Sequence, residues 1–111
     1  MLSLPPSVRV FVCTTPTDMR KSFDGLCALV ESALKQDPFS GHLFVFLGRR
    51  RDKMKILYWD RVGFSLLYRR LEEGTFRMPE RGEIGSRELL MMLEGLDVAE
   101  VRERRWYQRR V

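Results

Sequence analysis

The chain has 111 residues, of which 44% are hydrophobic and 32% are charged, and its formal net charge at pH 7 is +5. This length suits one packed domain and is too short for two independent cores, so we expect a domain over residues 1–97 and a basic tail over 98–111. No apolar run approaches the roughly 20 residues of a membrane helix, and the N-terminus lacks a signal pattern, which indicates a cytoplasmic protein with no membrane partner.

Charge is unevenly distributed along the sequence. Residues 1–47 are balanced, 48–71 carry a net charge of +6, 72–100 carry −5, and 101–111 carry +4. The cationic middle segment favours contact with an anionic partner such as nucleic acid, and the acidic segment favours a second surface of opposite sign. The alternative is that each segment is a solvated face, because Lys and Arg are rarely buried.

The first predicted elements are a strand and a helix. Residues 8–13 are apolar and β-branched after two prolines, which predicts a strand, and 14–17 form a turn. Asp18 is a good N-cap, so a helix is expected from there to about Gln36. Its buried face has helical spacing and consists of Met19, Phe23, Leu26, Val30 and Leu34.

A β-hairpin is predicted next. Residues 42–47 and 54–59 are rich in aromatic and branched side chains, and a basic loop over 48–53 separates them. Alternation in the first strand leaves apolar groups on both of its faces. Either helices or a partner must therefore cover both faces of the sheet.

The segment 63–74 fits both a strand and a helix, and we favour a helix with Gly74 as its left-handed C-cap. A short strand over 75–78, a polar loop over 80–85, and a helix capped by Ser86 and ended by Gly95 follow. The predicted fold class is α+β, a single small domain in the order β-α-β-β-α-β-α with a largely antiparallel sheet. A ferredoxin-like arrangement is the expected topology.

The residues give no support for catalysis or for a metal site. Cys13, Cys27 and His42 are too few for zinc, and the default is two reduced, buried thiols, with a structural disulfide as the alternative. No phosphate loop, nucleophile elbow or metalloprotease motif is present. The carboxylates that could bind a metal for phosphodiester chemistry lack a clustering pattern; they are Asp18, Asp24, Asp60, Glu72 and Glu73. We expect a protein without catalytic residues or a cofactor.

Nucleic-acid binding is the function that the basic hairpin indicates. A cationic loop directly before an aromatic strand offers groups for phosphates and for bases. The candidate phosphate contacts are Arg49, Arg50, Arg51, Lys53 and Lys55, with Trp59 or Tyr58 as a stacking residue. Arg20 and Lys21 are added because they fall in the predicted first helical turn, where free amides could hold a phosphate. The alternative is that both simply extend into water.

Several motifs in order resemble a known family. Three sets of short motifs closely resemble the TnpB accessory proteins of the bacterial insertion-sequence family number sixty-six: residues 16–21 (PTDMRK) with 23–26 (FDGL), 37–41 (DPFSG) with 44–46 (FVF), and 55–60 (KILYWD) with 63–64 (GF). The resemblance implies a small protein that supports a separate, larger transposase and carries no catalytic residue of its own. The family usually has Gly where this chain has Arg51 and Arg61, which puts a tight turn at either place in doubt.

Two hypotheses follow for the function. The first is a non-enzymatic accessory protein that binds DNA through the hairpin with weak sequence preference. The second is an interaction module that binds the transposase or a sister accessory protein through the acidic residues 72–100 and the apolar sheet face. A strand edge or apolar face would also allow a homodimer. The tail over 98–111 is expected to be disordered until it meets a partner.

Overall fold

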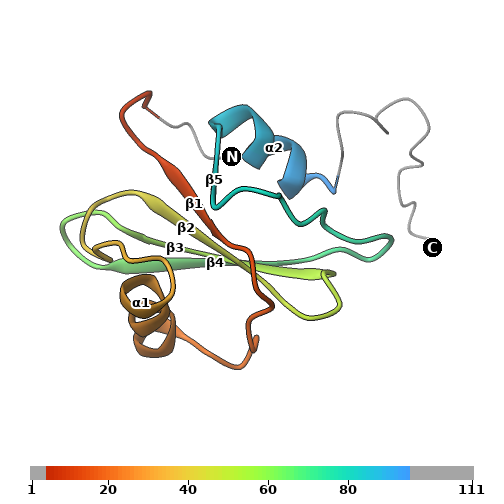
Figure 1. Cartoon of the computed structure of the whole chain (residues 1–111), viewed down its shortest axis with the longest axis horizontal. Coiled ribbons are helices and arrows are strands. Elements are labelled where there is room, and N and C mark those ends of the chain that lie inside the picture. Colours follow the sequence, from red (N-terminus) through yellow and green to blue (C-terminus); the bar gives the residue numbers. More distant parts are fainter. Residues whose placement is uncertain (1–4, 96–111) are drawn as a thin grey trace.

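A computed structural model describes residues 5–95, so the predicted tail over 98–111 and the domain boundary before it lie outside the described residues. The chain forms five strands and two helices (Figure 1). In order they are β1 (Val10–Cys13), α1 (Phe23–Ser32), β2 (Leu43–Leu47), β3 (Lys53–Trp59), β4 (Phe64–Arg70), β5 (Glu83–Ile84) and α2 (Ser86–Leu93).

The five strands form one sheet in the order β4-β3-β2-β1-β5. β1 and β2 pair in parallel, because α1 returns the chain to the starting edge between them, and the other three pairs are antiparallel. The predicted α+β class and largely antiparallel sheet are confirmed. The ferredoxin-like topology is wrong, since β2, β3 and β4 are consecutive neighbours and no helix interrupts them.

Both faces of the sheet are covered within the molecule (Figure 1). On one face, Leu26 and Val30 of α1 pack against inward-facing residues of β1, β2 and β3. On the other face, α2 and the buried Phe76 pack against the alternate residues of the same strands. This arrangement explains why β2 is apolar at every position. Of the two predicted alternatives, helices of this chain cover both faces of β2, and no partner is needed for this.

The helix predicted over 63–74 is wrong, because these residues form strand β4. All seven residues of β4 pair with β3 in a continuous antiparallel register, from Trp59 opposite Phe64 to Lys53 opposite Arg70. Gly74 has the expected positive φ of 78°, but in a turn after a strand. The strand predicted over 75–78 is also wrong: Phe76 is inserted into the core from an irregular segment, and the short strand is β5, within the predicted polar loop.

The first helix begins later than predicted. Asp18 is not its N-cap, because α1 starts at Phe23 with Ser22 as the capping residue. Asp18 instead accepts a hydrogen bond from the Arg20 amide at 2.9 Å, which closes a local turn. Arg20 and Lys21 therefore precede the helix, and the predicted phosphate site in its first turn does not exist in that form. The helix ends at Ser32, four residues before the predicted end.

Two non-glycine residues adopt left-handed backbone conformations in the hairpin turns. Arg51, between β2 and β3, has a φ of 58°, and Arg61, between β3 and β4, has a φ of 78°. The first turn is closed by the Arg51 amide donating to the Gly48 carbonyl at 2.9 Å, and the second by the Asp60 amide donating to the Gly63 carbonyl at 3.2 Å. The expectation that Arg51 and Arg61 would disfavour tight turns is therefore wrong. Both turns form, and each arginine adopts a backbone conformation that favours Gly.

Both cysteines are free, with Cys13 buried and Cys27 half-buried. Burial raises the pKa of the Cys27 thiol, and the nearby carboxylates of Asp24 and Glu31 raise it further. Neither described helix is long and apolar enough to cross a membrane.

Candidate nucleic-acid interface

The hairpin loop between β2 and β3 lies against the segment that links β1 to α1. A half-open cavity of about 390 Å³ lies between the two segments. It is lined from both sides, by Pro16, Thr17, Asp18, Met19, Arg20, Gly48, Arg49, Arg50, Asp52 and Lys53. We call this cavity the loop pocket. It brings together Arg20, Arg49, Arg50 and Lys53, four of the nine cationic and aromatic residues that the sequence put forward.

The two walls of the loop pocket are held together by specific contacts. The Thr17 amide donates to the Leu47 carbonyl at 2.8 Å, which attaches the linking segment to the end of β2. Gly48 allows a close approach on the same side: a Cβ there would meet the Met19 Cγ at 2.9 Å. A side chain at Gly48 would therefore displace the Met19 side chain from its position against the hairpin loop.

Lys55 is a third link between the walls and does not face solvent. Only 6% of its surface is exposed, and its Nζ donates to the carbonyls of Met19 and Lys21, both at 2.7 Å. The same ammonium lies 4.6 Å from the centre of the Tyr68 ring. These two carbonyls and the Tyr68 ring engage the Lys55 ammonium within the protein. Lys55 therefore holds the pocket wall in place, and we exclude it from the candidate phosphate contacts.

Cations in the loop pocket differ in how far they are neutralised. The Arg20 guanidinium pairs with Asp18, with Nη2 2.8 Å from Oδ2, and this hydrogen bonding holds the pKa of Asp18 well below its usual range. Lys53 has a longer contact of 3.9 Å with Asp52. Arg49 and Arg50 are exposed and have no ion pair within residues 5–95. The uncompensated positive charge therefore lies on the hairpin loop.

Strand β4 adds two arginines to this end of the sheet. The register places Arg70 opposite Lys53 and Arg69 opposite Met54, next to the base of the hairpin loop. Arg70 pairs with Glu72 at 2.7 Å, whereas Arg69 is exposed. Neither arginine is among the site residues predicted from the sequence.

The remaining sequence candidates lie elsewhere. Trp59 packs with Phe39 and Phe64, with ring centres 5.0 and 4.9 Å away. It is about 20 Å along β3 from Lys53, at about 3.3 Å per residue, so it cannot stack on a base held at the loop pocket. Figure 1 shows the turns before and after β3 at opposite ends of the sheet. Tyr58 packs against the core on the α2 side, and Lys21 does not line the pocket.

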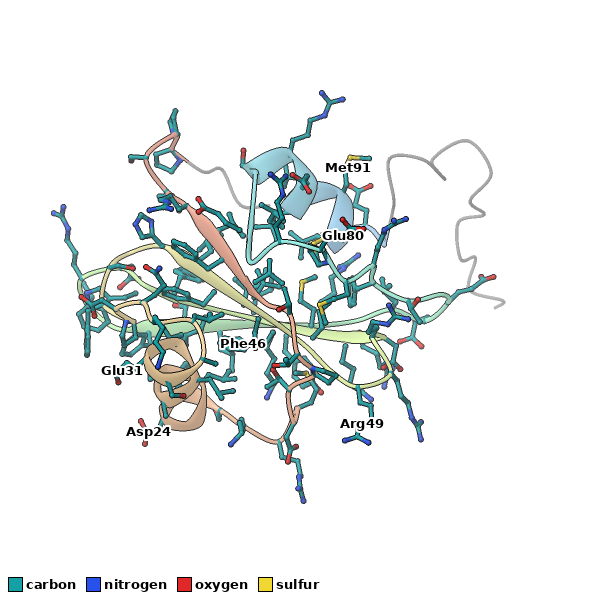
Figure 2. All side chains as sticks on the ribbon, viewed as in Figure 1. Asp24, Glu31, Phe46, Arg49, Glu80 and Met91 are labelled. Atoms are coloured by element: carbon teal, nitrogen blue, oxygen red, sulfur yellow. The ribbon has the colours of Figure 1, made fainter. Side chains whose placement is uncertain are left out.

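Arg51 and Arg49 extend from the hairpin loop. Arg51 is exposed without lining the loop pocket. Figure 2 shows Arg49 on the same lower side of the view as α1, whose position Asp24 and Glu31 mark, but to the right of that helix. The exposed cationic groups at this end of the sheet therefore lie at the hairpin tip, the rim of the loop pocket and the end of β4.

Thr17 and Asp52 are pocket residues that sequence reasoning missed. Thr17 is 6% exposed, and its hydroxyl is buried without a hydrogen-bond partner in the part of the chain that the structure describes. The signal available in the sequence was its place in the motif Pro16-Thr17-Asp18, which carries the family resemblance. Nothing local to Thr17 revealed that the hairpin loop would lie against it.

Within residues 5–95, no three His, Cys, Asp or Glu side chains gather in a group that could hold a metal ion. The raised pKa of Cys27 keeps its thiol protonated near neutral pH, which makes it a weak nucleophile.

Comparisons with known proteins give one family match and two similar proteins. A family model described as IS66 Orf2 like protein matches residues 8–103. Two proteins of Sinorhizobium fredii (strain NBRC 101917 / NGR234) are similar over most of their length. The uncharacterized protein y4jC is 35% identical over 94% of this chain and 92% of its own, and the uncharacterized protein y4hO is 39% identical over 87% and 88%. No solved structure matches.

Proposed function

The chain belongs to the IS66 Orf2-like protein family, and on that premise we propose that it is a non-catalytic accessory protein of insertion-sequence transposition that binds DNA. The contact surface is the basic end of the sheet: Arg49, Arg50 and Arg51 of the hairpin loop with Arg69 of β4. The single observation that carries the proposal is that Arg49 and Arg50 are exposed and unneutralised within residues 5–95.

The physical argument is one of charge without a partner. An exposed arginine paired to a carboxylate contributes little to polyanion binding, because the pair must first separate. Arg49 and Arg50 need no such separation, and the loop presents them with Arg51 on consecutive residues. Contacts of this kind go to phosphates, so affinity should depend strongly on salt and weakly on sequence.

The test is DNA binding by fluorescence anisotropy over a salt series. One duplex carries the terminal repeat of the element, and the other has the same composition in scrambled order. The double variant Arg49→Ala/Arg50→Ala should flatten the slope of log Kd against log salt, at about 0.9 per lost phosphate contact. The change is about 0.9 if both arginines hold one phosphate and about 1.8 if each holds its own. The matched control Arg61→Ala/Arg87→Ala removes two exposed arginines elsewhere and should leave the slope unchanged.

Equal slopes for the two double variants would exclude the hairpin loop as the contact surface. A tighter complex with the terminal repeat than with the scrambled duplex would add end recognition to the proposal. No binding of either duplex at low salt would exclude DNA binding itself.

A second candidate function is binding to the transposase or to a sister accessory protein. The observation that favours it is the outer edge of β4, which has no pairing strand within residues 5–95. Leu67 and Tyr68 on this strand are 38% and 52% exposed. An open seven-residue edge with apolar groups can accept a strand from a partner or from a second copy.

Co-purification with the transposase in high salt tests this second function. Association that survives high salt and is lost in Leu67→Lys would support edge pairing, because a buried lysine disfavours strand addition. Association lost in high salt would indicate contact through charge or through bridging DNA. The acidic segment 72–100 extends beyond the described residues.

A further inference from the structure

We propose that the loop pocket is a binding site for one phosphate group, held by Arg49, Arg50 and the hydroxyl of Thr17. The inference rests on the proposed function, because it makes this pocket the point where a nucleic-acid phosphate is anchored. It goes further in one respect: the contact becomes a defined site with a neutral hydrogen-bond donor. A charged surface alone would not need the pocket.

The two arginines supply the charge. Both belong to the hairpin loop, both line the pocket, and neither has an ion pair in the described part of the chain. A guanidinium presents a planar fork of donors that matches two oxygens of a phosphate. The pocket also contains two carboxylates, but Asp18 is already hydrogen-bonded to Arg20, and Asp52 lies 3.9 Å from the Lys53 ammonium. Four cations against two anions leave the pocket positive.

Thr17 is the independent observation. Buried hydroxyls in folded proteins nearly always have a hydrogen-bond partner, and the Thr17 Oγ1 has none within residues 5–95. The residue is one of those that line the pocket, and its hydroxyl is buried. A phosphate oxygen that enters there provides the acceptor that this hydroxyl lacks. Arginines on a loop can be explained by solubility alone, whereas an unpartnered hydroxyl at the same cavity cannot.

The size and walls of the cavity suit a phosphate with part of its sugar. The volume of about 390 Å³ is within the range of small-ligand sites, and Pro16 and Met19 provide apolar surface for a ribose or deoxyribose. The pocket walls are also preorganised by contacts within the protein. The bond from Thr17 to Leu47, the close fit of Met19 at Gly48, and the two bonds from Lys55 all hold the linking segment in place.

Thr17→Val is the informative variant, because it removes the hydroxyl and keeps both the shape and the charge. Since the hydroxyl has no partner in the described structure, its loss should leave the melting temperature of the free protein unchanged or raised. The matched control is Thr14→Val, an exposed threonine that does not line the pocket. Arg49→Ala/Arg50→Ala serves as the variant that removes the charge.

The first measurement is thermal unfolding with inorganic phosphate against chloride at equal ionic strength. Phosphate should raise the melting temperature of the wild type and of Thr14→Val, and should do so less for Thr17→Val and not at all for the arginine double variant. No effect of phosphate on the wild type would overturn the pocket. The proposed function would stand if DNA binding remained salt-sensitive, so the two failures are distinguishable.

The second measurement is binding of two short duplexes that differ only in a 5′-phosphate. Thr17→Val should weaken binding about three- to tenfold, the usual effect of one hydrogen bond, without changing the salt slope. Loss on both duplexes would assign an internal phosphodiester to the pocket. Loss confined to the phosphorylated duplex would assign a terminal phosphate. Unchanged affinity for both would overturn the proposal.

Discussion

Replacing Arg51 by Gly should stabilise the protein while weakening its proposed contact with DNA. Arg51 has a φ of 58°, a left-handed conformation that costs a residue with a side chain about 1–2 kcal/mol. Gly avoids this cost but loses about 0.5–1 kcal/mol through its greater freedom in the unfolded chain. The net gain is about 0.5–1 kcal/mol. For a domain of this size, that raises the melting temperature by about 2–5 °C.

The backbone contacts of the turn do not depend on the side chain. The Arg51 amide donates to the Gly48 carbonyl, and its carbonyl accepts from the Phe76 amide at 2.6 Å, and both bonds are available to Gly. Arg61→Gly, at a φ of 78° in the other hairpin turn, should give a similar gain. The two turns lie at opposite ends of β3, so the gains should add.

Thermal unfolding followed by circular dichroism measures the effect, with Arg51→Ala as the control. Arg51→Ala loses the same charge and keeps a side chain, so it should melt below Arg51→Gly. Both should bind DNA with a slope reduced by about 0.9, whereas Arg61→Gly should keep the wild-type slope. The reasoning fails if Arg51→Gly melts no higher than Arg51→Ala.

Three further predictions concern the supports of the fold and pocket. Lys55→Met should lower the free energy of unfolding, measured in urea, by about 1–3 kcal/mol, because two carbonyls lose a charged donor; unchanged amide exchange at residues 19–21 would contradict it. Phe76→Ala, at a fully buried position, should cost about 3–5 kcal/mol in the same assay, and a loss below 1 kcal/mol would show that Phe76 is not part of the core. Hydrogen bonds from Gly63 and Val62 lower the pKa of Asp60, so its stabilisation should be present above about pH 4 and lost as the pH falls through the lowered pKa. The urea midpoint of Asp60→Asn should therefore fall less than that of the wild type between pH 5 and pH 2, and parallel curves would contradict this.

Local sequence patterns were enough for several elements. The hairpin of β2 and β3 was predicted from two apolar strands around a basic loop, and α2 from helical spacing before Gly95. The α+β class followed from these elements, and the family resemblance was carried by short motifs in order. In each case, the information lies within a few residues of the element it describes.

Strand β4 shows where local patterns were insufficient. Its sequence, FSLLYRR, fits both periodicities, and helical spacing was preferred. Pairing with β3 makes this segment a strand. Its seven residues pair with the edge of β3 that is not occupied by β2. The same pairing brings Arg69 and Arg70 to the hairpin. Neither position is readable from the segment alone.

The basic loop was visible in the sequence, but the roles of its members were not. Lys53 and Lys55 look alike in the printed chain and point to the same face of β3. Lys53 is at the end of the strand and lines the loop pocket, whereas Lys55, one pleat further in, is covered by the segment that carries Met19 and Lys21. Sequence alone determined which residues are cationic. Only the tertiary structure decided that the charge of Lys55 is buried, because the carbonyls that accept its hydrogen bonds belong to residues 36 and 34 positions earlier in the chain.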